Sequence, residues 1–256
     1  MIGAAVTFLA VAIADLTAGG LGGTPVSRRR AVLGILAAAF VMLAGGWGAG
    51  WTMALVLVLT ASLAGVSAWL LLRSRERLDP RRAWVALAAL IAYLALGVGA
   101  EALWDAAPVD WLDRWLETLA FPALNMMEAD SLLLIVALFL FLTGTANGVV
   151  RTVLIAAGTE TERSEERLRG GRIIGVLERW MILALMLAGE TTAAGLVVSA
   201  KSILRFPELT RAAGESAGTE ASAGANVDHV TEYFLLGSLV SWLMAALLAL
   251  LFVGPF

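Results

Sequence analysis

The sequence predicts an all-α protein, a polytopic transmembrane helical bundle with about eight membrane segments. Three observations lead to this fold class. Hydrophobic residues make up 60% of the 256 residues and charged residues only 15%. Apolar runs of about twenty residues, the length that crosses a bilayer as a helix, recur from end to end. The basic residues gather in short clusters between these runs, although the net charge is only −3.

The expected spans follow from helix geometry, because about 20 residues at ~1.5 Å each cross a hydrocarbon core of ~30 Å. They are Met1 to Ala18, Ala31 to Gly48, Trp51 to Leu72, Ala83 to Ala100, Ser131 to Ala156, Arg172 to Ala188, Thr191 to Phe206, and Thr231 to Val253. The first is expected to be a retained helix rather than a signal peptide, because Asp15 interrupts its apolar run. The sixth and seventh are short, and Gly189 and Gly195 offer places to turn. We expect a tight hairpin there, with a re-entrant segment as the alternative.

We expect a single membrane domain with three parts. Residues 1–100 form an N-terminal four-helix transmembrane part, residues 101–130 an external acidic loop, and residues 131–256 a C-terminal transmembrane module with a charged layer. Within the loop, apolar residues recur at helical spacing in VDWLDRWLETLAF at 109–121. This pattern predicts an amphipathic helix lying on the membrane surface. A lid or a cation-attracting vestibule is the functional alternative.

The distribution of arginine predicts the orientation, because short cytoplasmic loops collect basic residues. The clusters at 27–30, 73–82 and 161–172 all fall on one side when the spans alternate. That side is expected to be the cytoplasm, and the acidic segment 101–130 is expected outside. The sequence thus predicts a multi-pass protein of the bacterial plasma (inner) membrane with both termini outside.

Several kinds of site are excluded by composition and motif. The chain has no cysteine and a single histidine, so thiolate chemistry and multi-histidine metal sites are ruled out. Phosphate-loop, zinc-protease, serine-hydrolase and dinucleotide-binding motifs are absent from the sequence. The basic clusters are short and lie at helix ends, which argues against nucleic acid as a partner. We therefore expect no metal and no cofactor.

Charges within the later apolar runs mark the candidate site. Arg151, Arg179 and Lys201 belong to three different spans, and each falls roughly 8–10 Å below the cytoplasmic edge. An unpaired charge at this depth costs ~3 kcal/mol or more, so these groups should pair, reach the interface, or line a hydrated cavity. The candidate ligand-binding residues of this layer are Asn147, Arg151, Arg172, Glu178, Arg179, Lys201, Ser202, Arg205 and Glu232.

Two acids are secondary candidates. Asp15 reaches the same layer from the first span, and Glu190 is expected at the outer turn of the hairpin. Glu190 is either a local helix cap or an entry point for a proton or cation. For the layer as a whole, a salt-bridge network that holds helices together is the structural alternative to a ligand pocket.

Three C-terminal segments carry a resemblance: GRIIGVLER at 171–179, AKSILRF at 200–206 and EYFLLGSLVSW at 232–242. In this order they resemble the C-terminal module of an uncharacterised group of bacterial integral membrane proteins. The resemblance implies that the charged positions form a recurrent module, namely Arg172, Glu178, Arg179, Lys201 and Arg205. It implies no activity.

Three functions fit these features. The first is a transporter or permease-like protein that binds an anionic solute or lipid headgroup in a polar pocket on the cytoplasmic side. The alternative is a non-transporting membrane scaffold or partner subunit, in which the same charges serve assembly with a second copy or another membrane protein. A membrane-embedded lipid-modifying enzyme comes third, with Glu178 or Glu190 as the general base. Membrane lipids are expected partners in every case.

Overall fold

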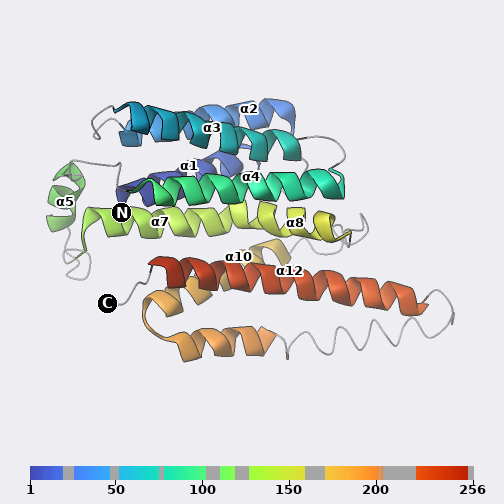
Figure 1. The fold of residues 1–256 in the computed structure, drawn as a ribbon. Helices are drawn as coiled ribbons and strands as arrows, with labels where there is room; N and C mark the ends of the chain where they lie inside the picture. Colours follow the sequence, from blue (N-terminus) through green and yellow to red (C-terminus); the bar gives the residue numbers. More distant parts are fainter. Residues whose placement is uncertain are drawn as a thin grey trace. The chain divides into compact units, whose positions relative to one another are not determined.

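In the computed structural model, the described residues are 1–19, 26–46, 52–74, 78–101, 110–118, 127–158, 171–201, 203 and 223–252. The side chains of 110–113, 171–172 and 223–234 lie outside this description. Within the described residues all regular structure is helical, which confirms the expected all-α class (Figure 1).

The helices follow the expected apolar runs closely. They are α1 (Ile2–Thr17), α2 (Arg28–Gly46), α3 (Met53–Arg73), α4 (Pro80–Gly99), α5 (Asp110–Glu117), α7 (Ala129–Thr143), α8 (Thr145–Ala157), α10 (Gly171–Leu187), an unlabelled helix over 191–201, and α12 (Ala223–Phe252). Polar residues begin two of them. Thr52 Oγ1 accepts the Leu55 N–H at the start of α3 (3.2 Å), and Asp79 Oδ1 accepts the Arg82 N–H at the start of α4 (2.7 Å).

Fewer membrane spans are present than the eight predicted. Within the described part of the chain, α2, α3, α4 and Leu235–Phe252 of α12 are each long and apolar enough to cross a bilayer. The pair α7 and α8, bent by 41° at Gly144, makes a fifth if it is one span. By contrast, α1 has 16 residues and therefore extends ~24 Å, short of a ~30 Å core. Helix α10 and the helix over 191–201 are also too short, because the chain turns between them.

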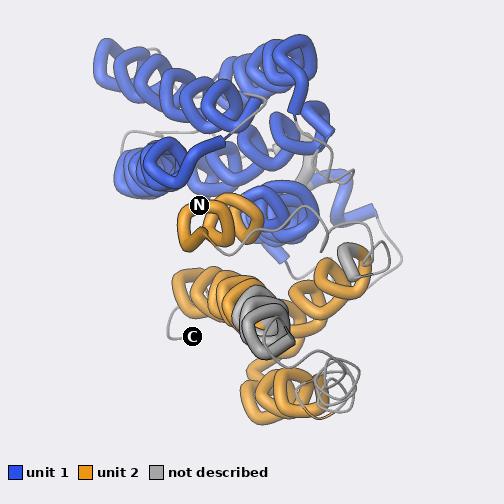
Figure 2. Tube along the Cα trace, turned by 90° about the vertical axis from the view of Figure 1, so that its right-hand side faces the viewer, with its two compact units in different colours: residues 1–148 blue, residues 149–256 orange. Residues whose placement is uncertain are grey.

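The chain divides into two compact units, residues 1–148 and residues 149–256 (Figure 2). The first unit includes α7, because α7 packs along α1. In the second unit, α12 packs against α10. Gly237 of α12 also lies against Val150 and Leu154 of α8.

Helix α1 is the core of the first unit, in contact with α2, α3, α4 and α7. It is apolar on all sides, as expected for a helix that neighbours surround. Glycines on those neighbours allow the close approach. A Cβ at Gly34 of α2 would lie 2.5 Å from the Ala14 carbonyl oxygen, and one at Gly97 of α4 would lie 2.2 Å from Thr7 Oγ1. Gly144 approaches α1 in the same way.

The acidic segment 101–130 contains the predicted helix, α5. Its Leu116 is 2% exposed and packs with Ala129 of α7, together with Leu132 and Leu133. Trp115 is half exposed. Part of the apolar side of α5 therefore contacts protein, and its contact with the membrane surface stays a prediction.

The turn between α10 and the next helix lies in the second unit, where a hairpin was expected. Gly189 adopts a φ of +78°, which favours glycine. The Glu190 N–H donates to the Leu185 carbonyl (2.8 Å) and the Gly189 N–H to the Met186 carbonyl (3.1 Å). This is the hydrogen-bond pattern of a Schellman cap. Gly195, the other proposed turning point, lies within the following helix.

Candidate functional site

Five side chains of the second unit meet where α10, α12 and the helix over 191–201 come together. Glu178 and Arg179 belong to α10, Lys201 to the helix after the turn, and Ser241 and Trp242 to α12. We call these residues the charged cluster. Glu178 lies eleven residues before Gly189 and Lys201 twelve residues after it. A hairpin that folds at Gly189 therefore brings these two residues level with each other.

Lys201 and Glu178 form an ion pair between the Nζ and Oε2 atoms, and their side chains are only 16% and 12% exposed. This pair connects the two arms of the hairpin. Lys201 Nζ also lies over the indole of Trp242, 5.5 Å from the ring centroid. A cation over the face of tryptophan is favourable, and more so where water is excluded.

Arg179 is the most deeply buried charge of the cluster, at 2% exposure. Its Nη1 donates to Ser241 Oγ on α12 at 2.8 Å. The sequence places Gly175 one turn before Arg179, and a Cβ there would meet only the Arg179 guanidinium, at 3.7 Å. The small residue leaves room for the long side chain to lie along α10 toward α12.

Trp242 contributes a buried polar atom, its indole Nε1, to the charged cluster. Its indole Nε1 has no hydrogen-bond partner among the residues that the structure describes. An indole N–H can only donate, so it needs an acceptor. Leaving such a donor buried and unpaired costs about 1–3 kcal/mol.

The other predicted members of the layer have different surroundings. Arg151 is half-buried on α8 in the second unit. Asn147 belongs to the first unit, and its side-chain amide donates to the Thr143 carbonyl one turn earlier at 3.1 Å. Glu190 is exposed, and its backbone carbonyl accepts the Ala194 N–H as a helix begins. The side chains of Arg172, Ser202, Arg205 and Glu232 lie outside the described residues.

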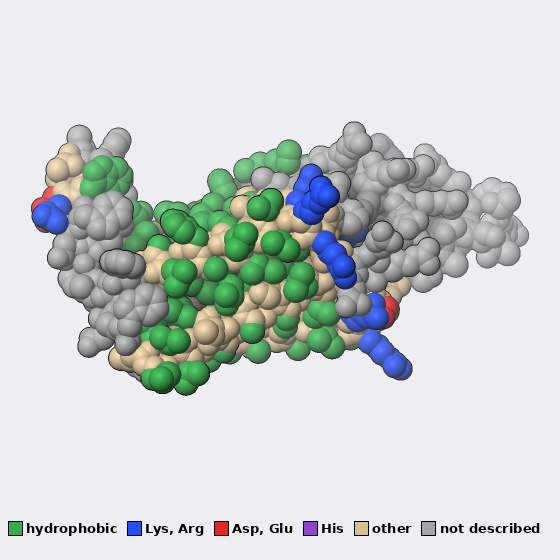
Figure 3. Space-filling view, turned by 90° about the horizontal axis from the view of Figure 1, so that it is seen from above, with side chains coloured by type: hydrophobic (Ala, Val, Ile, Leu, Met, Phe, Trp, Pro, Cys, Tyr) green, Lys and Arg blue, Asp and Glu red, His purple; other side chains and the backbone are tan. Residues whose placement is uncertain are grey.

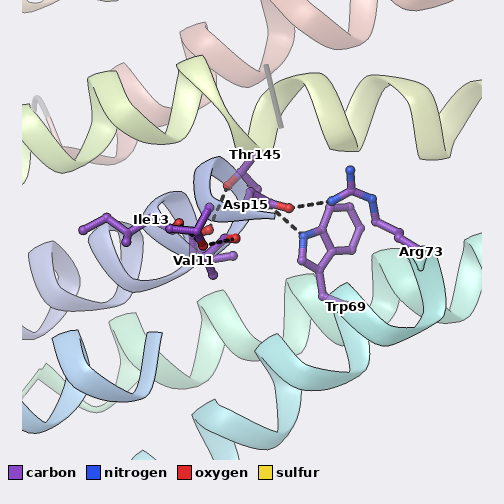
Figure 4. A network of polar contacts seen from close by, with 8 residues as sticks. Val11, Ile13, Asp15, Trp69, Arg73 and Thr145 are labelled. Carbon is purple, nitrogen blue, oxygen red and sulfur yellow. Dashed lines mark hydrogen bonds and ion pairs between the residues drawn. The ribbon is translucent and has the colours of Figure 1, made fainter. Parts of the chain in front are cut away.

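Asp15 has a separate site in the first unit rather than a place in the cluster (Figure 4). Its Oδ1 accepts a hydrogen bond from Arg73 Nη1 at 2.7 Å, and its Oδ2 accepts one from Trp69 Nε1 at 2.9 Å. The Arg73 guanidinium lies 4.4 Å from the centroid of the Trp69 ring. Asp15 is 1% exposed, so a buried carboxylate of α1 is neutralised and hydrogen-bonded by two residues of α3.

Sequence reasoning missed Arg73 and Trp69 as partners of Asp15. Arg73 was assigned to the cytoplasmic cluster at 73–82, although it is the last residue of α3. The available signal was the spacing. A lone acid in an apolar helix requires a cation at the same depth, and Trp69 and Arg73 lie one turn apart at the matching end of their helix.

No group of three or more histidine, cysteine or acidic residues suited to a metal ion occurs in the described part of the chain. Comparison of the sequence with protein-family models, with curated proteins and with solved structures finds no match. The residues of the charged cluster themselves therefore indicate its chemistry. It combines two cations, one carboxylate, a hydroxyl and an indole donor.

Proposed function

We propose that this is a multi-pass protein of the bacterial plasma membrane that binds an anionic solute or lipid headgroup at the charged cluster, as a transporter or permease does. The membrane assignment rests on the long apolar helices. The observation that carries the binding proposal is the buried indole N–H of Trp242, which lacks an acceptor among the described residues and lies beside a lysine. An anionic oxygen would supply that acceptor.

The balance of groups in the cluster favours an anion over a cation. Among the five side chains of the cluster, Arg179 and Lys201 carry positive charge and Glu178 carries negative charge. Ser241 and Trp242 add two further donors. Phosphate and carboxylate groups accept several hydrogen bonds at once and are bound best by arginine, whose planar fork matches them. A cation would meet mainly donors here.

A specific observation also favours the second candidate, a membrane scaffold or partner subunit. Two contacts of the cluster join helices: Glu178 with Lys201 across the hairpin, and Arg179 with Ser241 between α10 and α12. If these contacts serve only to hold the helices together, the cluster needs no ligand. We also propose that the cluster lies on the cytoplasmic side and that this segment belongs to a module shared by a group of bacterial membrane proteins. Both statements fit a ligand-binding role and a scaffold role equally well.

Two conservative variants distinguish anion binding from a purely structural role of the cluster. Arg179→Lys keeps the charge but loses the bidentate fork, and Trp242→Phe keeps the ring but loses the unpaired N–H. The measurement is the Tm of the purified protein in neutral detergent, with and without inorganic phosphate and carboxylic acids, which carry the anionic groups of a solute or a headgroup. A ligand of the folded state raises the wild-type Tm with its concentration.

Under the binding proposal, both variants fold and both lose most of the ligand-induced shift. Without ligand, Trp242→Phe is at least as stable as the wild type, because an unsatisfied buried donor has been removed. Trp84→Phe is the matched control, since Trp84 is 60% exposed on α4, and it should keep the full shift. If no anion raises the Tm of the wild type, or if the Tm of both variants rises as much as that of the wild type, the cluster serves only to hold helices together.

A further inference from the structure

A second basic surface lies at one end of the first unit, where Figure 3 shows lysine and arginine side chains gathered at the edge of a hydrophobic face. We infer that five exposed arginines, which we call the arginine rim, bind the phosphate groups of anionic membrane phospholipids. They are Arg28, Arg29, Arg30, Arg81 and Arg82. This inference shares only the membrane location with the proposed function and does not depend on the charged cluster.

The rim residues come from two helices but share one end of the bundle. Arg28 to Arg30 begin α2, and a Cβ at Gly19, just beyond α1, would lie 3.2 Å from Arg30 Nη1. Arg73, the last residue of α3, contacts Asp15 near the same end of α1. Helix α4 begins only a few residues after α3 ends, with Arg81 and Arg82 in its first turn. All five guanidinium groups therefore belong to the end of the unit where α1 finishes.

Immediately beyond the rim, both helices turn their apolar side chains outward. On α2, Val32, Leu33 and Leu36 are 51%, 58% and 61% exposed. On α4, Trp84 is 60% exposed and Val85 is 56% exposed. Such a surface is stable in hydrocarbon, and exposed tryptophan is typical of the membrane interface. The hydrocarbon boundary consequently lies within one turn of the arginines, at the depth of the lipid phosphates.

Among the described residues, positive charges outnumber acids at this end of the unit. Asp15 forms an ion pair with Arg73, which is not a rim residue. Asp79 caps α4, and its carboxylate lies 3.6 Å from the Nε of Arg82. The opposite end of the unit is acidic, with Glu101 and Asp130 partly exposed there. A basic rim attracts anionic lipids electrostatically, and arginine adds the geometry that suits phosphate.

The test compares phosphatidylglycerol with phosphatidylcholine, added to the full-length protein in mixed micelles. The variant Arg28→Gln/Arg29→Gln/Arg81→Gln removes three rim charges and spares Arg30, beside Gly19, and Arg82, beside Asp79. We expect phosphatidylglycerol to raise the wild-type Tm more than phosphatidylcholine does, and added salt to reduce the difference. The glutamine variant should lose at least about half of that difference. The equivalent triple lysine variant keeps the charge and should retain most of it.

The controls separate this inference from the proposed function. Arg114→Gln removes an exposed arginine from α5 and should leave the phosphatidylglycerol effect intact. Arg179→Lys changes the charged cluster and no rim residue, so the glutamine variant should cause the same loss of the effect with and without Arg179→Lys. The rim inference is overturned if the glutamine variant keeps the full effect. It is also overturned if the two lipids raise the Tm of the wild type equally, or if salt does not reduce the difference between them. These two measurements require only the wild-type protein.

Discussion

Asp15 illustrates at the scale of single residues how this chain tolerates charge in an apolar environment. Its carboxylate lies near the C-terminal end of α1, where the helix dipole is unfavourable for an acid. Arg73 and Trp69 compensate by providing a positive charge and two hydrogen-bond donors from α3. The charged cluster uses comparable chemistry, with Lys201 placed between a carboxylate and an indole.

Asp15→Asn should destabilise the protein by about 3 kcal/mol, because it strands the buried Arg73 guanidinium without a counter-charge. Adding Arg73→Gln should recover part of that loss, since the two residues share one interaction. Asp79→Asn is the matched control. Its carboxylate is half exposed, and asparagine caps helices nearly as well, so its effect should stay below about 1 kcal/mol. Chemical denaturation in detergent measures the wild type, Asp15→Asn, Arg73→Gln, the double variant and Asp79→Asn. Additive effects of Asp15→Asn and Arg73→Gln would disprove the coupling.

At the scale of helices, glycine determines how closely elements approach and where they turn. The helices around α1 present glycines to it, so the packing of the first unit depends on the absence of side chains at these points. In the second unit, the positive φ of Gly189 allows α10 to end and the next helix to begin at once.

Gly97→Ala should destabilise the first unit, because the added Cβ would lie 2.2 Å from Thr7 Oγ1 on α1. Either Thr7 must shift or α4 must move away from the core helix, at a cost of about 1–3 kcal/mol. Gly99→Ala is the control two residues later, where a Cβ meets nothing within 4 Å. A change in Tm should therefore accompany the first substitution and not the second. Equal effects would mean that α4 does not pack on α1 through Gly97.

Gly189→Ala and Gly195→Ala should act in opposite directions. Alanine at position 189 must adopt the left-handed conformation of a φ near +78°, which costs it about 1 kcal/mol. Position 195 lies inside a helix with nothing within 4 Å, so alanine there should stabilise by up to about 1 kcal/mol through its helix propensity. Melting of the two purified variants tests this, and a stabilising Gly189→Ala would argue against the Schellman turn.

At the scale of the whole molecule, charge separates along the first unit. Exposed arginines lie at the end where α1 finishes, and Glu101 lies at the end where it starts, with its carboxylate accepting the N–H groups of Gly3 and Ala4. Helix N-termini favour such an acid. The same polarity orients membrane proteins, because basic loops stay in the cytoplasm.

Cysteine labelling in intact cells tests the proposed orientation, since the natural chain has no cysteine to interfere. Ser27→Cys, at the basic end, should be shielded from a membrane-impermeant thiol reagent. Thr118→Cys, just after α5, should react, and both positions are exposed in the folded chain. Permeabilised cells provide the control, because both cysteines should then be labelled. Labelling of Ser27→Cys alone in intact cells would reverse the topology.

Local sequence patterns determined the helical class, the approximate position of every described helix and the turn near Gly189. These features depend on composition, apolar run length and glycine, all of which are visible in one chain. They also placed Glu178 and Lys201 among the candidates of one charged layer, but they did not pair these two residues with each other. The burial of Arg179 followed from its depth in an apolar segment.

Only the tertiary structure decided which helices are long enough to span a membrane and which residues neutralise Asp15. Helix α1 is apolar on all sides, so its sequence does not indicate which face meets which neighbour. The rotation and axial position of each helix depend on glycine contacts between distant segments, such as Gly97 with Thr7. That is why the sequence alone did not indicate that Asp15 pairs with Arg73 and Trp69 of α3.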